Sequence, residues 1–224
     1  MVTASTNIDI NGLIDHTYLK ANCTPEDIEV LCQEALRYRF HSICIPPYFV
    51  SQARNIIGPN SAVKICTVVG YPMGYSTVAA KVEEIKRAAL DGADELDVVI
   101  NLAAIKAGDW NYIKNDIEST TTMCHLKGRK IKIVFESSEL EAGEVKKLVE
   151  ICEKHRVDYI KASIGLINQT TTLEQIQYLR RIIGPSIKLK VEGKFKTKEE
   201  IGLLIAAGVN RIGTTSSIRL ISNH

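Results

Sequence analysis

Two lysines, Lys161 and Lys190, stand in short runs of β-branched and apolar residues that are typical of neighbouring strands. Because side chains alternate in direction along a strand, both lysines lie opposite the apolar faces of the segments 159–165 and 187–193. Two ammonium groups in one cavity repel each other, and burial also disfavours the charged form. We therefore expect one of the two lysines to lose its proton near neutral pH. A neutral lysine beside a second cation is a nucleophile suited to Schiff-base chemistry.

A carboxylate in a nearby run is placed to move protons for that chemistry. Asp97 lies in ELDVVIN (95–101), two predicted strands before Lys161. It either transfers protons or neutralises one lysine in a buried ion pair, and the residue pattern leaves both interpretations open. Asp15, in the first predicted strand, has the same two interpretations: a member of the proton network or a paired structural carboxylate.

The elements that must position these residues alternate regularly along the chain. Apolar runs are each followed by a segment with charges at helical spacing, and Gly92 and Gly208 mark helix ends. Such alternation predicts a parallel sheet with right-handed crossovers, and eight units without a GxGxxG turn favour a closed barrel over a doubly wound sheet. We predict an α/β fold, a single-domain (β/α)8 TIM barrel over residues 1–224. The predicted strands are 13–19, 42–46, 64–70, 95–101, 130–136, 159–165, 187–193 and 211–216; the predicted helices are 25–38, 47–57, 78–91, 103–126, 140–155, 172–183, 197–207 and 217–222.

Charged residues dominate one side of the fourth to seventh predicted strands. Because helices cover the outside of such a barrel, the apolar sides must point outward and the Lys, Asp and Glu side chains inward. Buried charges are costly unless paired, so they indicate either an ionic network or an active site at the C-terminal mouth, and we favour the active site. In this interior we expect Lys132 and Glu136 to form a supporting ion pair. Glu192 either holds Lys190 or perturbs the site.

The composition excludes several classes of function. The chain has 224 residues, 45% of them hydrophobic, with a net charge of +2 and scattered basic residues, so we expect no nucleic-acid partner. No apolar stretch approaches the roughly 20 residues that span a bilayer, and the N-terminus lacks a secretory pattern, so we expect no membrane association. The cysteines form no CxxC pair and no zinc spacing, which predicts buried free thiols, no metal and a cytoplasmic location. They are Cys23, Cys32, Cys44, Cys66, Cys124 and Cys152.

The motifs that carry these residues resemble those of the deoxyribose-phosphate aldolase family over nearly the whole chain. The resemblance implies a reversible cleavage of 2-deoxyribose 5-phosphate to acetaldehyde and glyceraldehyde 3-phosphate, without a metal or organic cofactor, in a homo-oligomer (a dimer or a tetramer). It implies that Lys161 forms the Schiff base, that Lys190 lowers the pKa of Lys161, and that Asp97 shuttles protons with a bound water. The matching segments are IDHTYLK (14–20), CIPPYFV (44–50), CTVVGYPMG (66–74), GADELDVVINLAAIKAGDW (92–110) and VDYIKASIG (157–165).

The expected phosphate site departs from the family pattern. After its seventh strand the family has two adjacent glycines and an arginine, whereas this chain has Gly193, Lys194 and Lys196. Glycines let backbone N–H groups approach a phosphate closely. Lys194 either blocks that approach or, with Lys196, supplies point charges instead. The other expected phosphate-binding residues are Gly165, after the Schiff-base strand, and Gly213, Thr215 and Ser216, after the eighth strand.

Two alternative functions remain open. The altered turn at 193–196 is compatible with a Schiff-base aldolase that acts on a different or non-phosphorylated substrate. A catalytically inactive barrel that binds a phosphorylated ligand or a partner protein is the alternative from another class. The presence of Asp97, Lys161 and Lys190 argues against it.

Overall fold

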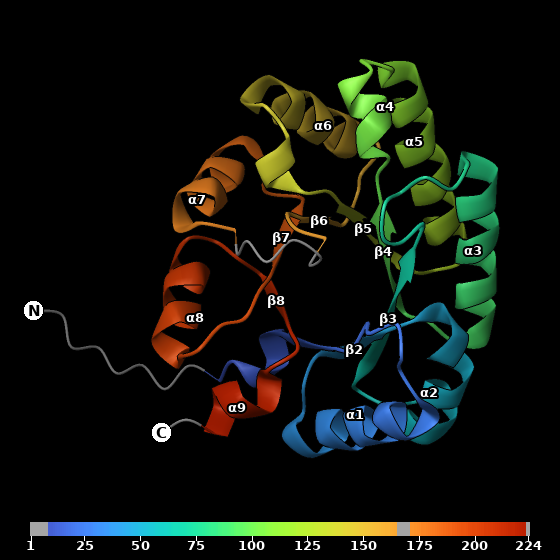
Figure 1. Ribbon diagram of the computed structural model, residues 1–224, viewed down its shortest axis with the longest axis vertical. Helices are drawn as coiled ribbons and strands as arrows, with labels where there is room; N and C mark the ends of the chain where they lie inside the picture. The colour runs from blue at the N-terminus through green and yellow to red at the C-terminus, as the bar shows by residue number, and fades with distance from the viewer. Residues whose placement is uncertain (1–8, 165–170, 223–224) are drawn as a thin grey trace, which may run out of the picture.

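Eight parallel strands form the centre of the molecule. The computed structural model describes residues 9–164 and 171–222, and in it the strands pair in chain order, with β8 pairing to β1. Figure 1 shows the helices arranged around these strands. The prediction of a closed, single-domain (β/α)8 barrel is therefore confirmed. The strands are β1 (Ile14–Thr17), β2 (Ser42–Ile45), β3 (Lys64–Val69), β4 (Glu95–Val99), β5 (Lys130–Val134), β6 (Tyr159–Lys161), β7 (Lys188–Glu192) and β8 (Arg211–Thr214).

The helices begin and end largely where the sequence signals predict. Thr24 caps the first helix: its side chain accepts from the Asp27 N–H, and its own N–H donates to the Asp27 carboxylate. The helices are α1 (Pro25–Tyr38), α2 (Val50–Ile57), α3 (Val78–Asp91), α4 (Leu102–Lys106), α5 (Trp110–Leu126), α6 (Ala142–Lys154), α7 (Leu173–Ile182), α8 (Lys198–Ala206) and α9 (Ser217–Ser222), with 3-10 turns η1 (Asn11–Leu13), η2 (Pro47–Phe49) and η3 (Ser137–Glu139).

The segment 103–126, predicted as one helix, is divided into α4 and α5. Gly108 has a φ of 74°, a left-handed conformation that ends the first piece. Asp109 then caps the second piece, because its side chain accepts from the Tyr112 N–H at 3.0 Å. The prediction missed this break, since the charge spacing continues through it.

The hydrophobic core lies between the strands and the ring of helices. Leu96 and Val98 of β4 and Ile131 and Ile133 of β5 are fully buried in it, on the predicted outward faces. Lys130 and Lys188 share the strand parity of the inward residues, but they are exposed because they begin β5 and β7 at the amino-terminal rim of the barrel. Within the described ranges, none of the helices combines the length and apolar character that a bilayer crossing requires.

Candidate active site

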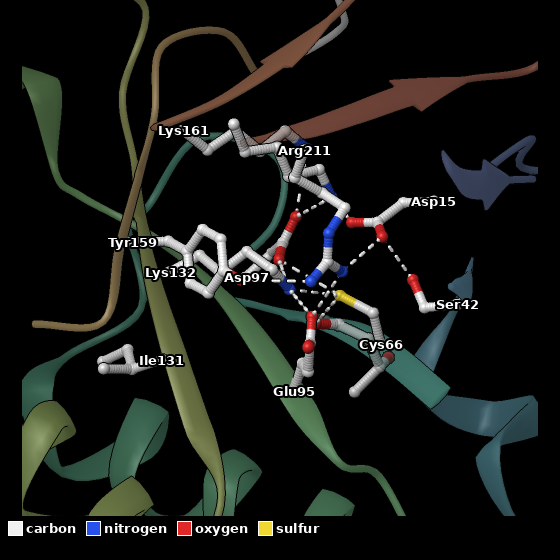
Figure 2. A network of polar contacts seen from close by, with 12 residues as sticks. Asp15, Ser42, Cys66, Glu95, Asp97, Ile131, Lys132, Tyr159, Lys161 and Arg211 are labelled. Atoms are coloured by element: carbon white, nitrogen blue, oxygen red, sulfur yellow. Dashed lines mark hydrogen bonds and ion pairs between the residues drawn. The ribbon is translucent and has the colours of Figure 1, made fainter. Parts of the chain in front are cut away.

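Asp97 of β4 lies at the centre of a buried cluster of lysines. Its Oδ2 accepts hydrogen bonds from Nζ of Lys161 at 3.2 Å and of Lys190 at 3.1 Å. Its Oδ1 accepts from Lys132 Nζ at 2.9 Å, and all four side chains are at most 1% exposed. Figure 2 shows Asp97, Lys132 and Lys161 in this network. The barrel thus brings together the three predicted catalytic residues and Lys132.

The strand register explains this convergence. Asp97 is the direct neighbour of Lys132 on β5, and Lys161 of β6 is the direct neighbour of Lys190 on β7. In a closed barrel, inward side chains from different strands meet in layers across the interior. The long lysine side chains therefore reach a carboxylate that comes from another part of the ring.

The pKa values of the two central lysines contradict the expectation that one of them is neutral. Burial lowers the pKa of Lys161, but Glu192 and Asp97 outweigh burial and the repulsion from Lys190, so the pKa is raised. Burial also lowers the pKa of Lys190, but Asp15 and Asp97 outweigh it and raise the pKa well above its usual value. The deprotonation prediction is wrong because it counted the two cations and omitted the carboxylates that surround them.

Asp97 is held in its ionised form. Burial would raise its pKa, but Lys132, Lys190 and Lys161 outweigh burial and hold the pKa well below its usual range. A carboxylate in contact with three ammonium groups is a weak base. It is a strong stabiliser of positive charge that develops on a neighbouring nitrogen.

Glu192, at the end of β7, contacts Lys161 rather than Lys190. Its Oε2 forms an ion pair with Lys161 Nζ, and its side chain is 10% exposed, compared with 1% for Lys161. Gly213 of β8 makes room for this arrangement: a Cβ at that position would lie 3.2 Å from Glu192 Oε2 and 3.2 Å from Lys190 Cε. Of the two interpretations of Glu192, the one that had it hold Lys190 is wrong.

The cluster of Asp97, Lys161 and Lys190 is one ionic layer of the barrel interior. A second ionic layer lies around Arg211 of β8. The Arg211 guanidinium donates to Asp15 Oδ1 at 2.8 Å, to Glu95 Oε2 at 3.4 Å and to the Tyr159 hydroxyl at 3.0 Å. Glu95 also forms an ion pair with Lys132 at 2.7 Å. Sequence reasoning did not select Arg211 or Glu95 as site residues. The alternation in RIGTTS (211–216) places Arg211 on the same side as Gly213 and could have identified it.

Asp15 of β1 joins the two layers. Its Oδ2 forms an ion pair with Lys190 Nζ at 2.7 Å, while its Oδ1 accepts from Arg211 and from the Ser42 hydroxyl, the latter at 2.6 Å. Burial would raise the pKa of Asp15, but Lys190 and Arg211 outweigh it and lower the pKa. Asp15 therefore stays ionised between two cations, which agrees with the paired structural interpretation.

The expected ion pair between Lys132 and Glu136 is absent. Lys132 contacts Asp97 and Glu95, whereas Glu136 accepts from the Ser163 hydroxyl at 3.0 Å and the Ile164 N–H at 3.2 Å. Four residues along one strand span about 13 Å, so the two side chains meet different layers of the interior. Glu136 instead fixes the backbone that follows β6.

Two thiols also point into the barrel. Cys66 donates to Asp97 Oδ1 at 3.1 Å and accepts from Lys132 Nζ at 3.2 Å, and burial raises the pKa of this thiol. Sγ of Cys44, Sγ of Cys66 and a carboxylate oxygen of Asp97 lie within 4.8 Å of one another. A metal ion there would have to displace ammonium groups that already occupy the carboxylate, so the set is better suited to hydrogen bonding. All six cysteines are free, and all but the half-buried Cys23 are buried.

The expected phosphate-binding turns lie side by side. The Gly193 N–H donates to the Gly213 carbonyl at 3.1 Å, which ties the turn after β7 to β8. Lys194, Lys196 and Thr215 are exposed, and Ser216 is half-buried. The predicted residue Gly165 lies outside the described residues.

Lys194 also borders a cavity beside α8. The cavity has a volume of about 270 Å³, and most of its lining is apolar. It is lined by residues at the start of α7 and along α8. The lining residues are Thr171, Leu173, Lys194, Phe195, Glu200, Leu203 and Leu204.

Buried lysines with carboxylates between them, on the inner side of a closed (β/α)8 barrel, are the arrangement of a barrel enzyme that works through an amine. The model of one known family, described as DeoC/LacD family aldolase, matches residues 10–215. The chain belongs to this family.

Individual relatives agree with this assignment. A protein of Thermococcus gammatolerans named deoxyribose-phosphate aldolase is 40% identical over 215 residues, which are 96% of each chain. A solved structure described as "QR15, an Aldolase" has a TM-score of 0.88 and 32% identity, and the match covers 95% of this chain and 94% of that one. A tetrameric deoxyribose phosphate aldolase from Aeropyrum pernix has a TM-score of 0.86 at 23% identity, over 95% of this chain and 89% of that one, and shows the same fold.

Proposed function

We propose that this protein is a class I aldolase that reversibly cleaves 2-deoxy-D-ribose 5-phosphate to acetaldehyde and D-glyceraldehyde 3-phosphate. The observation that carries the proposal is the contact of two buried lysines, Lys161 and Lys190, with the same Asp97 oxygen. The name of the Thermococcus gammatolerans relative supports the substrate.

The proposed reaction begins at Lys161. Its neutral amine attacks the C1 aldehyde of the open-chain sugar, and loss of water from the carbinolamine leaves an iminium ion. The C3 hydroxyl loses its proton, its oxygen forms a carbonyl as the C2–C3 bond breaks, and glyceraldehyde 3-phosphate leaves. The iminium accepts the electron pair of the C2–C3 bond, so the chemistry requires no metal or organic cofactor. Protonation of the resulting enamine at C2 and hydrolysis release acetaldehyde and restore the lysine.

Asp97 and Lys190 support this reaction in different ways. The Asp97 carboxylate, ionised and 3.2 Å from Lys161 Nζ, stabilises the positive iminium nitrogen. As the family resemblance implies, Asp97 would also relay protons through a bound water. Lys190 shares Asp97 Oδ2 with Lys161, so it limits how strongly that oxygen holds the Lys161 ammonium group.

Reductive trapping tests the Schiff base directly. The protein is incubated with acetaldehyde and borohydride, and peptides are mapped by mass spectrometry. We expect an ethyl adduct on the peptide that carries Lys161 and none in Lys161→Ala. Lys154→Ala, an exposed position on α6, is the matched control and should be trapped like the parent protein. Absence of an adduct on Lys161 in the parent would exclude the mechanism.

A second candidate function is a Schiff-base aldolase for a non-phosphorylated substrate. Lys194 stands where the family has a glycine, and the Glu192 carboxylate approaches Gly213 at the expected phosphate turn. A negative charge at that position disfavours a phosphate by like-charge repulsion. Turnover of 2-deoxyribose compared with its 5-phosphate separates the two candidates, because a strong preference for the phosphate excludes the second. Retro-aldol turnover that disappears in Lys161→Ala excludes an inactive ligand-binding barrel.

We also propose that the enzyme acts in the cytoplasm as a homo-oligomer, a dimer or a tetramer. The tetrameric state of the Aeropyrum pernix aldolase supports an assembly, and the buried free thiols are suited to a reducing compartment. Analytical ultracentrifugation of the purified chain tests the assembly, and a monomer at micromolar concentration would contradict it.

A further inference from the structure

The Schiff-base reaction requires a group that takes the first proton from the Lys161 ammonium group. Lys161 is an ammonium group between two carboxylates, and only its neutral amine can attack an aldehyde. Asp97 is one of these carboxylates, but its two oxygens already contact Lys132, Lys161 and Lys190. Three cations stabilise its ionised form, so Asp97 is poorly placed to take the first proton.

Glu192 is the other carboxylate at the Lys161 nitrogen, and its surroundings differ from those of Asp97. Its Oε2 forms the ion pair with Lys161, and within the described residues no hydrogen bond satisfies this oxygen. Its side chain is 10% exposed, whereas the Asp97 side chain is 1% exposed. Glu192 therefore lies nearer the open end of the site, with one ammonium partner instead of three.

We propose that Glu192 is a catalytic residue that removes the proton from the Lys161 ammonium group and returns it to the hydroxyl that leaves the carbinolamine. The role assumes the proposed function, in which Lys161 forms the Schiff base.

Glu192 takes one proton from Lys161–NH3+, which leaves a neutral amine and a protonated carboxyl. The amine nitrogen forms a bond to the aldehyde carbon, the carbonyl electron pair moves to oxygen, and a proton passes from nitrogen to that oxygen. Glu192 then protonates the resulting hydroxyl, the C–O bond breaks, and water leaves. One ammonium ion and one aldehyde thus become one iminium ion and one water, and Glu192 is again ionised.

Groups on β2, on β4, on β7 itself and in the segment after β3 face this pair and contribute to its pH dependence. Asp97 of β4 raises the pKa of Lys161, and Lys190 of β7 lowers it. Cys44 of β2 also acts on Lys161, in the direction that raises its pKa. Tyr71, after β3, is half-buried, and burial raises the pKa of its phenol, an effect that Lys161 opposes and Glu192 reinforces. These groups stay in place when Glu192 is substituted, so a change in the pH profile reports the lost carboxylate.

The test compares Glu192→Gln with the parent in the rate at which acetaldehyde is trapped on Lys161 by cyanoborohydride, from about pH 6 to about pH 10. We expect the trapping rate at the upper end of this range to fall about 10²-fold, because an amide can neither accept the proton of the ammonium group nor return it to the hydroxyl that leaves. We also expect the acid limb of the profile to move to lower pH, because the carboxylate that raises the pKa of Lys161 is gone. Glu192→Asp keeps the charge and should recover part of the rate.

A rescue experiment distinguishes the loss of a catalytic carboxylate from misfolding of the variant. Glu192→Ala removes the carboxylate and leaves space beside Lys161, so added formate should restore its trapping rate in proportion to the formate concentration. Glu199→Gln, an exposed carboxylate at the start of α8, is the matched control and should behave like the parent. A trapping rate in Glu192→Gln equal to or above that of the parent at about pH 10 would overturn the role, as would an unshifted acid limb. Failure of the parent itself to be trapped on Lys161 would instead refute the proposed function.

Discussion

Two ionic layers inside the same barrel consist of the same kinds of residue but have different characters. Around Arg211, the guanidinium donates to three different side chains, two of them carboxylates, so its charge and N–H groups are largely satisfied. Around Lys161, the ammonium lies between Asp97 and Glu192, and Glu192 is partly open to the mouth. The Arg211 cluster is therefore suited to a structural role, because its charges are paired away from solvent. The Lys161 cluster is suited to chemistry, because Glu192 is near solvent and can exchange a proton.

Lys161→Ala should have the largest effect on turnover, and it should leave the layer around Arg211 intact. We expect retro-aldol turnover to fall on the order of 10⁴-fold, because the nucleophile is lost. The fold should persist, since Asp97 keeps contacts with Lys132 and Lys190. Turnover of deoxyribose 5-phosphate and the circular dichroism spectrum are measured together. Turnover within tenfold of the parent would contradict the assignment of chemistry to this layer.

Arg211→Met should produce the opposite pattern. Removal of one member of a buried ionic network leaves charges unpaired, and we expect a loss of about 3–5 kcal/mol in the free energy of unfolding. Turnover per folded molecule should stay close to that of the parent, because Arg211 does not contact Lys161. Urea unfolding and active-site titration give the two quantities. If turnover fell sharply while stability held, the two layers would not be functionally distinct.

Acid should destabilise both layers through their carboxylates. Burial would raise the pKa of Asp97 and of Glu95, but the neighbouring cations outweigh it and lower both. A lowered pKa in the folded state contributes stability above the unfolded value of about 4, and this stability is lost as pH falls toward the folded pKa. We expect the urea midpoint to be nearly constant from about pH 5 to pH 8 and to fall steeply below about pH 4. A midpoint independent of pH down to about pH 3 would contradict the ionic assignment.

Lys194→Gly should have the smallest effect. Lys194 is exposed, and an exposed point charge contributes about 1 kcal/mol or less to binding an anion. We expect KM for deoxyribose 5-phosphate to change by less than about tenfold, with kcat unchanged. Lys154→Gly on α6 is the surface control. A larger rise in KM would make Lys194 a main phosphate ligand, and a fall would indicate that its side chain obstructs the turn.

Alternation along single strands was a reliable guide to which side chains enter the barrel. It placed Asp97, Lys132, Lys161 and Lys190 inside, where the structure has them. It was less reliable at the rims, where exposed Lys130 also has inward parity. The alternation of side chains along a strand determines whether a side chain points inward or outward. It does not determine how deep along the barrel axis that side chain lies.

The pairing of charges was not accessible from single strands. Lys132 was expected to meet Glu136 on its own strand, but it contacts Asp97 and Glu95 on the neighbouring one. Glu192 of β7 contacts Lys161 on the neighbouring strand β6, although Lys190 is closer in the chain. Each partner depends on register and closure, which involve residues far apart in the sequence.

The sequence by itself determined the alternation of strands and helices, the inward direction of the central charges and the choice of Lys161 as the proposed nucleophile. These features depend on local periodicity and on motifs, which neighbouring residues specify. Only the tertiary structure decided which carboxylate each lysine meets, and therefore that Lys161 rests as an ammonium group beside Glu192 rather than as a neutral amine. Protonation follows from the sum of burial and all nearby charges, and that sum exists only once the barrel is closed.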